Sequence, residues 1–590
     1  MLLPWNLKRK QKVLLFLVAF FILCKLWMRW KKEISYDMLQ DMKSEKHRNS
    51  DDKSEVKDKN DESGSLISEE VEKDRTGETF TKSKTRRKLK LVPQKEEKEK
   101  SAREELEEVE KKLPNIPLLF MYDNKEKKGH GKSCTIKVPN LNRIRYNNIY
   151  WQEFVSPYGT FYLYGAYFDN RKGNKLGPTI RILTMVDGAI QGDPKIYCQA
   201  WFDDKELKFV SAKVTEFQEI FHTPEKHKHF KRGTLLLYLL SCPLPSQYTN
   251  QPPITVSLTL KACQLATNHL KVIYNSEPHK KDFAVCIRGL SFPNYDISIR
   301  LVEWIETLLL LGVDKIFFYK FDIHPNMQAT LDHYVENGKA ELTAISTPGY
   351  QPNEKLLQEF YLHDLANEED RITVERLHLN DCLYRNIHRY KYIAIIDNDE
   401  LILPPKQELL TWNDLFHDME RQFFAKNNNK WSEKSKSTQT FDPHSFSFRM
   451  TYFMDTMLSS QLTSKKNNDV DVEGIKKIPD YMYMARHVYR SPKHAPDITY
   501  AKSIHNTDYV KTVSHHFSLE CLNGPCYSGY IVDKDLGHLQ HYRDFCQTTL
   551  EKVCKKEYMS SFVKDTTIWK YKQKLLHNSK KTLDKLRLLQ

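Results

Sequence analysis

The sequence lacks several features that would assign it to common classes of protein. Its 590 residues contain no Asn-x-Ser/Thr sequon, so the chain itself is not expected to carry N-linked glycans. No internal repeat is visible. The formal net charge of +14 is spread along the chain, so we interpret the basic excess as a solvated face and expect no nucleic acid partner.

Hydrophobic runs are also short. Near the N-terminus the uninterrupted apolar run Val13–Cys24 has only twelve residues, the length of a signal-peptide core. No small-residue cleavage site follows it, and a snorkelling Lys25 extends the apolar span to residue 30. The preceding tail has no acid and four basic residues, Lys8, Arg9, Lys10 and Lys12. We therefore predict a cytosolic tail (1–12) and an uncleaved signal anchor (13–30) of a single-pass type II protein, with a cleaved signal peptide as the alternative.

Cysteine usage agrees with a lumenal location. One of the eleven cysteines, Cys24, lies in the predicted anchor, and the remaining ten permit up to five disulfides in an oxidising compartment. The nearest pairs are Cys521 with Cys526 and Cys546 with Cys554, although spacing does not fix the connectivity. A C-x4-C spacing also occurs in zinc sites, but no second thiol pair lies at finger spacing, which favours the disulfide.

The first part of the predicted lumenal region is too polar to form a core. Residues 31–113 are rich in Lys, Glu, Asp and Ser, and we predict a stem that holds the rest of the chain away from the membrane. Within it "KEEKEKSAREELEEVEKK" is compatible with a solvated helix stabilised by i,i+4 ion pairs. Residues 114–280 then contain short β-branched and aromatic runs such as "TFYLYGAYFDNR", "TIRILTMVDG" and "TLLLYLL". These runs predict a β-rich, sandwich-like domain.

From residue 281 the pattern changes to alternating strands and helices. "FAVCIRGL", "KIFFYK", "ELTAI" and "YIAII" indicate strands, and the segments between them indicate helices. Gly312 ends the first helix, whose apolar face is formed by Ile297, Leu301, Ile305, Leu308 and Leu309. This alternation predicts an α/β fold with a parallel sheet that binds its ligand at the carboxyl ends of the strands.

The stretch "KYIAIIDNDELILP" places three acids at such a strand end, Asp397, Asp399 and Glu400. Two carboxylates one residue apart can hold a hard divalent cation, which in turn can bridge the oxygens of a diphosphate. The rival interpretations are a capped strand end with solvated acids, an EF-hand loop and a dehalogenase-type phosphatase. An EF-hand loop needs a glycine and further ligands that this stretch does not supply. The phosphatase pattern has Thr or Val at the position where this chain has Leu401.

Five segments, in order, resemble glycosyltransferase family 92: "LVEWIETLLLLGVDKIFFYK", "LHLNDCLYRN", "YIAIIDNDELILP", "AKSIHNTDYVKTVSHHF" and "HYRDF". The resemblance covers about Phe283 to Phe545. It implies a GT-A type nucleotide-sugar-binding domain over residues 281–560, preceded by the β-rich domain and followed by a basic tail (561–590). It also implies UDP-galactose as the donor and Mn2+ as the metal, because the family includes β-1,4-galactosyltransferases that extend a terminal galactose on N-glycans.

The resemblance also implies roles for particular residues. Asp397 and Asp399 match the metal motif of the family, and Glu400 matches the acid that follows it. In this fold a histidine late in the chain commonly completes the metal shell, and His541 is the first candidate and His516 the second.

Other polar residues of these segments have more than one interpretation. Lys502 and Arg543 are candidates to pair with the diphosphate, or equally with surface acids. A family motif on the preceding helix is open to both a packing role and a donor contact; it consists of Asn380, Asp381 and Cys382.

The catalytic base is the least determined part of the predicted site. Inversion at the anomeric carbon needs a carboxylate that takes the proton of the acceptor hydroxyl. Asp455, which follows the strand "FSFRMTYFMD", is the predicted base, and Asp471 and Glu473 are alternatives.

The sequence therefore leads us to expect a Golgi membrane galactosyltransferase that acts on glycoprotein N-glycans, with its catalytic domain in the lumen. The short anchor suits the thinner membranes of the early secretory pathway. The alternative from a different class is a non-catalytic glycan-binding protein of the secretory pathway, and a homodimer is left open.

Overall fold

The computed structural model describes residues 72–73, 79–80, 101–190, 192–203, 205–220, 235–362, 368–428, 441–463, 470–496, 500–526, 529–544 and 551–589. The predicted signal anchor and most of the predicted stem lie outside these residues. Among the described residues no helix is long and apolar enough to cross a membrane. The paired strands β1 (Glu72–Lys73) and β2 (Thr79–Phe80) belong to residues 1–98, and all other described elements belong to one compact unit, Glu99–Gln590.

A short solvated helix opens the compact unit, as the charge pattern predicted. Helix α2 (Ala102–Lys112) begins after Ser101, whose hydroxyl accepts from the Glu104 backbone N–H while the Glu104 carboxylate accepts from the Ser101 N–H. Lys111 and Glu107 form an i,i+4 ion pair of 3.2 Å, and no residue of the helix is buried.

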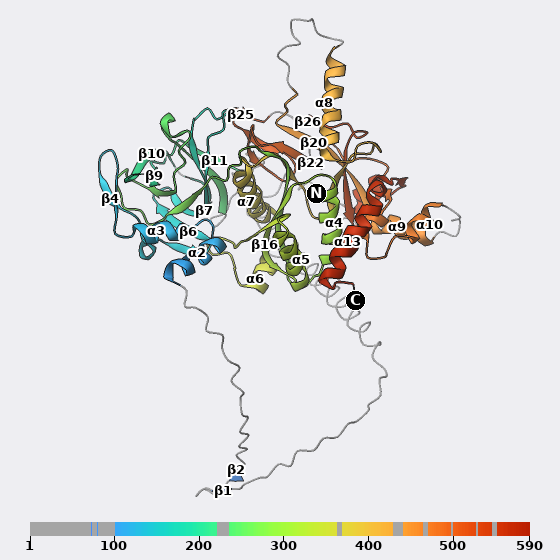
Figure 1. Ribbon diagram of the computed structural model, residues 1–590, viewed down its shortest axis with the longest axis horizontal. Coiled ribbons are helices and arrows are strands. Elements are labelled where there is room, and N and C mark those ends of the chain that lie inside the picture. Colours follow the sequence, from blue (N-terminus) through green and yellow to red (C-terminus); the bar gives the residue numbers. More distant parts are fainter. Residues whose placement is uncertain are drawn as a thin grey trace, which may run out of the picture. The chain divides into compact units, whose positions relative to one another are not determined.

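The β-rich region forms a sheet of twelve strands, and the three runs quoted from the sequence lie in β7, β8 and β12 (Figure 1). The order across the sheet is β11, β12, β8, β7, β14, β13, β9, β10, β3 and β4, with β6 beside β7 and β5 beside β6. Side chains from distant strands of the sheet share one apolar core, which includes Leu163, Ile182, Cys198, Leu240 and Leu258. Two parts of the sheet therefore bury this core between them. The strands are β3 (Lys128–His130), β4 (Thr135–Lys137), β5 (Tyr146–Asn148), β6 (Trp151–Ser156), β7 (Gly159–Asp169), β8 (Thr179–Asp187), β9 (Tyr197–Asp203), β10 (Leu207–Lys213), β11 (Glu216–Glu219), β12 (Leu235–Pro243), β13 (Thr255–Thr259) and β14 (Leu270–Ile273).

A second large sheet has nine strands and contains the region that follows residue 281. Its order is β17, β16, β15, β18, β22, β20, β27 and β19, with β26 beside β20. The strands from β15 to β18 pair in parallel and confirm the predicted α/β arrangement, whereas β22 is antiparallel to both β18 and β20. The strands are β15 (Lys281–Phe292), β16 (Lys315–Ile323), β17 (Ala340–Ala344), β18 (Tyr390–Ile395), β19 (Glu400–Leu403), β20 (Ser445–Met454), β22 (Ala501–Asn506), β26 (Tyr530–Ile531) and β27 (His538–Arg543). Smaller ladders join β21 (Tyr489–Arg490) to β28 (Val563–Lys564), and β24 (Ser518–Cys521) to β23 (Val510–Val513) and β25 (Gly524–Pro525).

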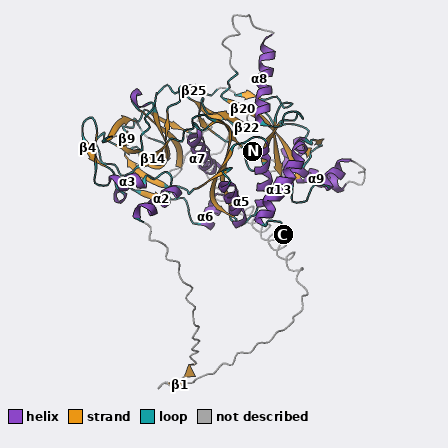
Figure 2. Cartoon of the chain, in the orientation of Figure 1, coloured by secondary structure: helices purple, strands orange, loops and turns teal. Residues whose placement is uncertain are grey.

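Helices cover both faces of the nine-stranded sheet (Figure 2). One face shares an apolar core with α4, α5, α8 and α13, whereas α7 lies on the other face, between this sheet and the twelve-stranded one. Helix α4 forms where the sequence predicted it, and the φ of +89° at Gly312 is a backbone conformation that favours glycine. The helices are α3 (Leu118–Asn124), α4 (Ser298–Leu310), α5 (Pro325–Glu336), α6 (Lys355–Phe360), α7 (Glu368–Asn386), α8 (Trp412–Asn428), α9 (Asp455–Thr463), α10 (Val470–Lys476), α11 (Tyr483–Arg486), α12 (Glu551–Tyr558) and α13 (Lys572–Leu586).

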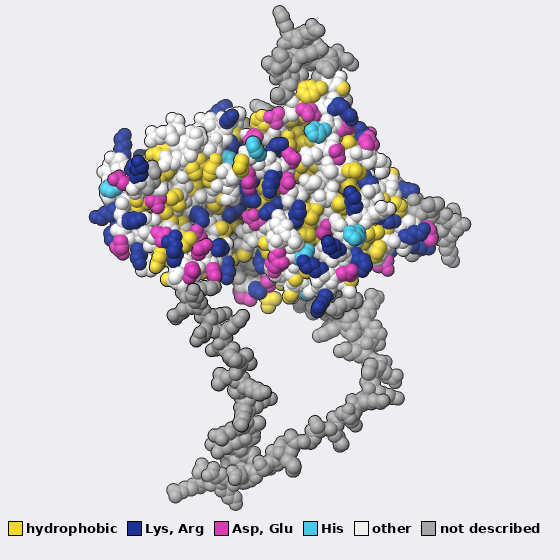
Figure 3. All heavy atoms as spheres, in the orientation of Figure 1, with side chains coloured by type: hydrophobic (Ala, Val, Ile, Leu, Met, Phe, Trp, Pro, Cys, Tyr) yellow, Lys and Arg dark blue, Asp and Glu magenta, His cyan; other side chains and the backbone are white. Residues whose placement is uncertain are grey.

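The lysine-rich C-terminal segment is folded onto the compact unit. Helix α13 packs against α4 and buries Leu575 and Leu583, while most of its lysines, among them Lys580 and Lys585, are exposed. On the face shown in Figure 3, Lys and Arg side chains are interspersed with Asp and Glu rather than gathered in one patch. The helix thus contributes both to the core and to a surface of mixed charge.

The motif of helix α7 joins the two large sheets. The buried Asp381 carboxylate accepts from the hydroxyls of Tyr167 on β7 and Tyr319 on β16, the latter over 2.6 Å, and from Arg385 over 2.8 Å. The Asn380 side chain bonds the backbone of β23. Of the two roles left open for this motif, the structure supports packing.

Disulfides reinforce the same regions. The described cysteines form the pairs Cys134–Cys263, Cys198–Cys242, Cys286–Cys382 and Cys521–Cys526. The third pair ties β15 to α7, next to Asp381, and the fourth is one of the two nearest-neighbour pairs considered from the sequence. Cys554 is also disulfide-bonded, while Cys546 lies outside the described residues.

Asp381 supplies a direct test of this packing. Replacing Asp381 by Ala should destabilise the protein by about 3–5 kcal/mol, because it leaves the buried Arg385 guanidinium without its partner. Urea unfolding of the purified chain measures the effect. As a matched control, Asp282→Ala removes an acid from an exposed pair with Lys391 and should cost no more than about 1 kcal/mol. Equal losses from the two substitutions would contradict the role given to Asp381.

Candidate active site

The three predicted acids lie in a tight turn between β18 and β19. The Glu400 N–H donates to the Asp397 carbonyl over 3.1 Å, and the Asp397 N–H donates to the Glu400 carboxylate over 2.8 Å. Neighbouring elements hold the turn from outside: Trp304 Nε1 of α4 donates to the Glu400 carbonyl, and the Tyr542 N–H of β27 donates to the Asp399 carbonyl. The backbone of the turn is therefore fixed by hydrogen bonds at both ends.

A buried lysine compensates the charge of this turn. Lys502, whose side chain is 2% exposed, places Nζ 2.8 Å from Asp397 Oδ2 and 3.2 Å from Glu400 Oε2. It reaches this position because β22 runs antiparallel to β18, with Ser503 opposite Ile395. The sequence predicts a diphosphate or surface acids as partners of Lys502, and the structure pairs it with the buried Glu400 and the half-buried Asp397.

A second cation contacts the same turn. Arg288, on β15, lies 3.4 Å from Asp397 Oδ1. Burial alone raises the pKa of Asp397, but the charges of Lys502 and Arg288 outweigh it and hold that pKa well below its usual range. For Glu400 burial prevails over Lys502, and the pKa is raised. Asp397 is thus firmly ionised in the folded protein.

Asp399, Glu400 and His541 form a group that can hold a metal ion. Their ligand atoms all lie within 4.8 Å of one another. His541 Nε2 lies 3.2 Å from Asp399 Oδ2, and Nδ1 lies 3.6 Å from Glu400 Oε1, because β27 pairs with β19 so that His541 stands opposite Glu400. Two carboxylates and an imidazole suit a divalent cation such as Mn2+.

A cavity adjoins the turn on the side of β15. It has a volume of about 160 Å³, and its lining includes Arg288, Phe292, Phe321, Glu375, His378 and Asn398. Arg288 also contacts Glu375, which lies 2.7 Å from His515. Burial raises the pKa of Glu375, but the contact with His515 outweighs this effect and lowers that pKa to about 2. The cavity therefore combines aromatic walls with a guanidinium group, a combination that can accommodate a base and a phosphate.

The other predicted ligands occupy different environments. His516 Nδ1 lies 2.9 Å from the Ala501 carbonyl, and burial together with the charge of Lys502 lowers the pKa of His516 to about 4. His516 is not part of the group formed by Asp399 and His541. Arg543 is the last residue of β27 and is half-buried at the same edge of the sheet.

The predicted base, Asp455, lies at the end of β20, next to the end of β27. It contacts His487 Nε2 and the Tyr483 hydroxyl, each over 2.8 Å. Of the alternatives, Glu473 is exposed on α10, and the side chain of Asp471 lies outside the described residues.

Sequence reasoning missed Arg288, Glu375 and His487. The argument that singled out Asp397, a polar residue at the carboxyl end of a parallel strand, applies equally to "FAVCIRGL" and would have found Arg288. Glu375 and His487 carry no such signal, because their partners come from elements far away in the sequence.

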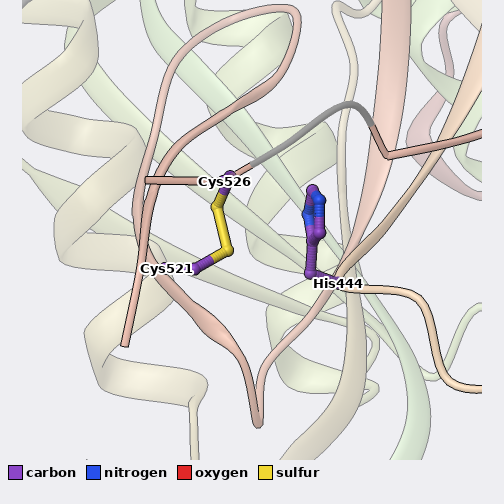
Figure 4. Close-up of side chains that lie close together, drawn as sticks. All are labelled: His444, Cys521 and Cys526. Carbon is purple, nitrogen blue, oxygen red and sulfur yellow. A yellow bond between two sulfur atoms is a disulfide. The ribbon is translucent and has the colours of Figure 1, made fainter. Parts of the chain in front are cut away.

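A second group of potential metal ligands is excluded by its chemistry. His444 lies beside Cys521 and Cys526, but the two sulfurs are bonded to each other (Figure 4). A disulfide offers no thiolate to a metal. This group is therefore structural.

Comparison with known proteins identifies the family of the region that contains the site. The family model described as glycosyltransferase family 92 matches residues 281–579, half of the chain, and confirms the resemblance seen in five segments. The matched region contains every residue of the candidate site. Among curated proteins, none matches the chain.

Replacing Lys502 tests the charge balance of the turn. Lys502→Met should lower the free energy of unfolding at pH 7 by about 3–5 kcal/mol, because it leaves the buried Glu400 carboxylate without a cation and Asp397 with Arg288 alone. Lys391→Met, on the neighbouring strand β18, removes an exposed lysine and is the matched control.

The pH dependence gives a second readout of the same substitution. Because the folded-state pKa of Asp397 is depressed, its contribution to stability is present above the unfolded pKa of about 4 and is lost as the pH falls below it. Urea unfolding should show a smaller acid-side loss in Lys502→Met than in the wild type. An unchanged free energy of unfolding at pH 7, together with an unchanged loss of stability at acidic pH, would contradict the assigned role of Lys502.

Proposed function

The chain belongs to glycosyltransferase family 92, and from this premise we propose that it transfers galactose from UDP-galactose, with inversion, in a β-1,4 linkage to a terminal galactose of glycoprotein N-glycans. The observation that carries the proposal is the group of Asp399, Glu400 and His541 beside the cavity that Arg288 lines. Both lie at the carboxyl ends of parallel strands, where open α/β sheets bind ligands.

The two parts of the donor, its base and its diphosphate, can be assigned to the cavity and to the acidic turn beside it. In the proposal, residues 281–560 form a GT-A type domain in which the uracil ring enters the cavity between Phe292, Phe321 and His378. The diphosphate then lies near Arg288 and the acidic turn. Arg288 is suited to phosphate because its planar guanidinium can donate two hydrogen bonds to one group.

The residues present fit a divalent cation. Asp399 and His541 would hold Mn2+, with Glu400 behind them, whereas the Asp397 carboxylate is already paired with Lys502 and Arg288. When bound, the cation supplies positive charge to the diphosphate of the leaving nucleotide. The role of Asp397 in this scheme is to keep Lys502 and Arg288 in place.

The alternative from a different class is a non-catalytic protein that binds glycans with a degenerate site. The intact metal-ligating group and the adjoining cavity favour the enzyme. Binding of UDP that is independent of Mn2+, without any transfer, would favour the alternative.

Substitution of the proposed metal ligands tests the activity. Transfer of labelled galactose from UDP-galactose to a galactose-terminated acceptor is measured across a Mn2+ titration, beside a thermal melt. Asp399→Asn should reduce turnover at least about 100-fold, because a directly coordinating carboxylate stabilises the transition state by several kcal/mol. His541→Ala should raise the Mn2+ requirement more than His516→Ala. Asp282→Asn, an exposed acid, is the control and should leave both turnover and melt unchanged.

Two outcomes would contradict this assignment. Near-normal turnover of Asp399→Asn would remove the acidic turn from the mechanism. Without metal the clustered carboxylates repel one another, and Asp399→Asn relieves this repulsion, so the variant should be no less stable than the wild type. A large fall in its melting temperature would therefore show that the role of Asp399 is structural.

The proposed location is the Golgi membrane, with the catalytic domain in the lumen and the chain anchored through residues 13–30. A glycosylation sequon appended to the C-terminus should give a glycosidase-sensitive increase in mass, because the chain has no sequon of its own. Replacing the basic residues of the tail, Lys8, Arg9, Lys10 and Lys12, with neutral ones should reduce the glycosylated fraction. An unshifted wild-type chain with the tag would overturn the proposed topology.

A further inference from the structure

Only one carboxylate oxygen of Asp455 makes hydrogen bonds within the described part of the chain. Asp455 is the first residue of α9, directly after β20, and its Oδ1 contacts both the Tyr483 hydroxyl and His487 Nε2 at 2.8 Å. No contact of Oδ2 occurs within the described part of the chain, and the side chain is 40% exposed. One oxygen of this carboxylate is therefore fixed, while the other faces the solvent.

The hydrogen bonds of His487 determine where its protons lie. His487 Nδ1 lies 2.6 Å from the Tyr483 carbonyl, which can only accept, so Nδ1 carries a proton and donates it. The contact between Nε2 and Asp455 needs a second proton, because two lone pairs would otherwise face each other. The 2.8 Å contact is thus a hydrogen bond that ties Oδ1 of Asp455 to His487.

Helix α4 keeps His487 and Tyr483 in place. The buried Glu303 carboxylate accepts the N–H groups of Met484 and Ala485 at the start of α11. Burial raises the pKa of Glu303 to about 7, an effect that its backbone hydrogen bonds oppose. These bonds anchor the backbone of α11, which carries Tyr483 and leads directly into His487.

The remaining charged groups around Asp455 come from two other elements. Arg300 of α4 stacks 3.7 Å from the centre of the Tyr483 ring and contacts Asp544, which follows β27, over 3.2 Å. The Tyr483 hydroxyl lies 3.1 Å from the same Asp544 carboxylate. The groups that act on Asp455 are thus His487, the Tyr483 hydroxyl and Arg300, and Asp544 contacts the last two.

Strand register places this cluster on the edge of the candidate site. β20 pairs in parallel with β27, with Tyr452 opposite His541 and Met454 opposite Arg543. Asp455 therefore follows the strand that runs beside the proposed metal ligand His541. In the order of the sheet, β18 and β22 separate β20 from β15, the strand that lines the cavity, so the cluster lies apart from the cavity.

We propose that His487 is a positioning residue that, together with Tyr483, fixes Oδ1 of Asp455 so that Oδ2 faces the hydroxyl of the acceptor sugar. The inference rests on the proposed function and adds the residues that define its acceptor side. In the step concerned, the acceptor oxygen bonds to the anomeric carbon as the bond from that carbon to UDP breaks and its electron pair leaves with UDP. The hydroxyl proton passes to Asp455 and then to solvent.

The pH dependence of transfer distinguishes this role from a structural one. Burial raises the pKa of Asp455, but the hydrogen bonds of His487 and Tyr483 outweigh it and lower that pKa, so removing the hydrogen bond of His487 should raise it. In His487→Gln the acid limb of kcat/KM for galactose transfer by the full chain should move up by about one to two pH units. The loss of activity should therefore be largest at acidic pH and shrink toward pH 8. Tyr483→Phe, a smaller change, should shift the limb in the same direction by less.

The controls separate the possible failures. His538→Gln alters another histidine–aspartate contact, with Asp565, at the opposite end of β27, and should leave the limb where it is in the wild type. A loss by the same factor at every pH in both His487→Gln and Tyr483→Phe would overturn the positioning role. If His487→Gln fails to fold, Tyr483→Phe alone decides between these results. A wild-type chain that neither transfers galactose nor hydrolyses UDP-galactose would instead refute the proposed function.

Discussion

The ammonium group of Lys502, buried between Asp397 and Glu400, is the interaction on which the geometry of the candidate site depends. A strand that ends in three acids would be unstable if all of them had to be buried without a cation, because removing a charge from water costs several kcal/mol. Lys502 and Arg288 supply that cation from neighbouring strands. Asp399 and His541, at the outer end of the turn, then remain for a ligand that arrives from solvent.

Helix α4 links the donor and acceptor sides of the site. Its Trp304 holds the backbone of the acidic turn, and its Glu303 and Arg300 hold the cluster around Asp455. The other face of the sheet is fixed by α7, whose Asp381 joins tyrosines of both large sheets. The β-rich region therefore stiffens the sheet on which the site is built, and a site on rigid elements can keep its reacting groups in position.

Much of the scaffold could be predicted from the sequence because it depends on local patterns. The apolar face of α4 and the strand ending at Ile395 are readable from periodicity, and the acidic turn follows from the rule that ligands bind at strand ends. The partners of those acids could not be derived, because they depend on register between strands far apart in the sequence. Only the family resemblance favours His541, the sequence leaves Lys502 open between a diphosphate and surface acids, and it carries no signal for His487. A pairing such as Glu400 with His541 exists only once β19 and β27 are aligned.

A divalent cation and a nucleotide diphosphate are expected to bind together at the ends of neighbouring strands of the nine-stranded sheet. The most direct measurement is calorimetric titration of the full chain with UDP, in Mn2+ and in EDTA, paired with titration of Mn2+ in the presence and absence of UDP. The account predicts that each ligand tightens the binding of the other by the same factor, as thermodynamic linkage requires. It also predicts that His541→Ala abolishes this coupling. An affinity for UDP that is the same in EDTA as in Mn2+ would contradict the account.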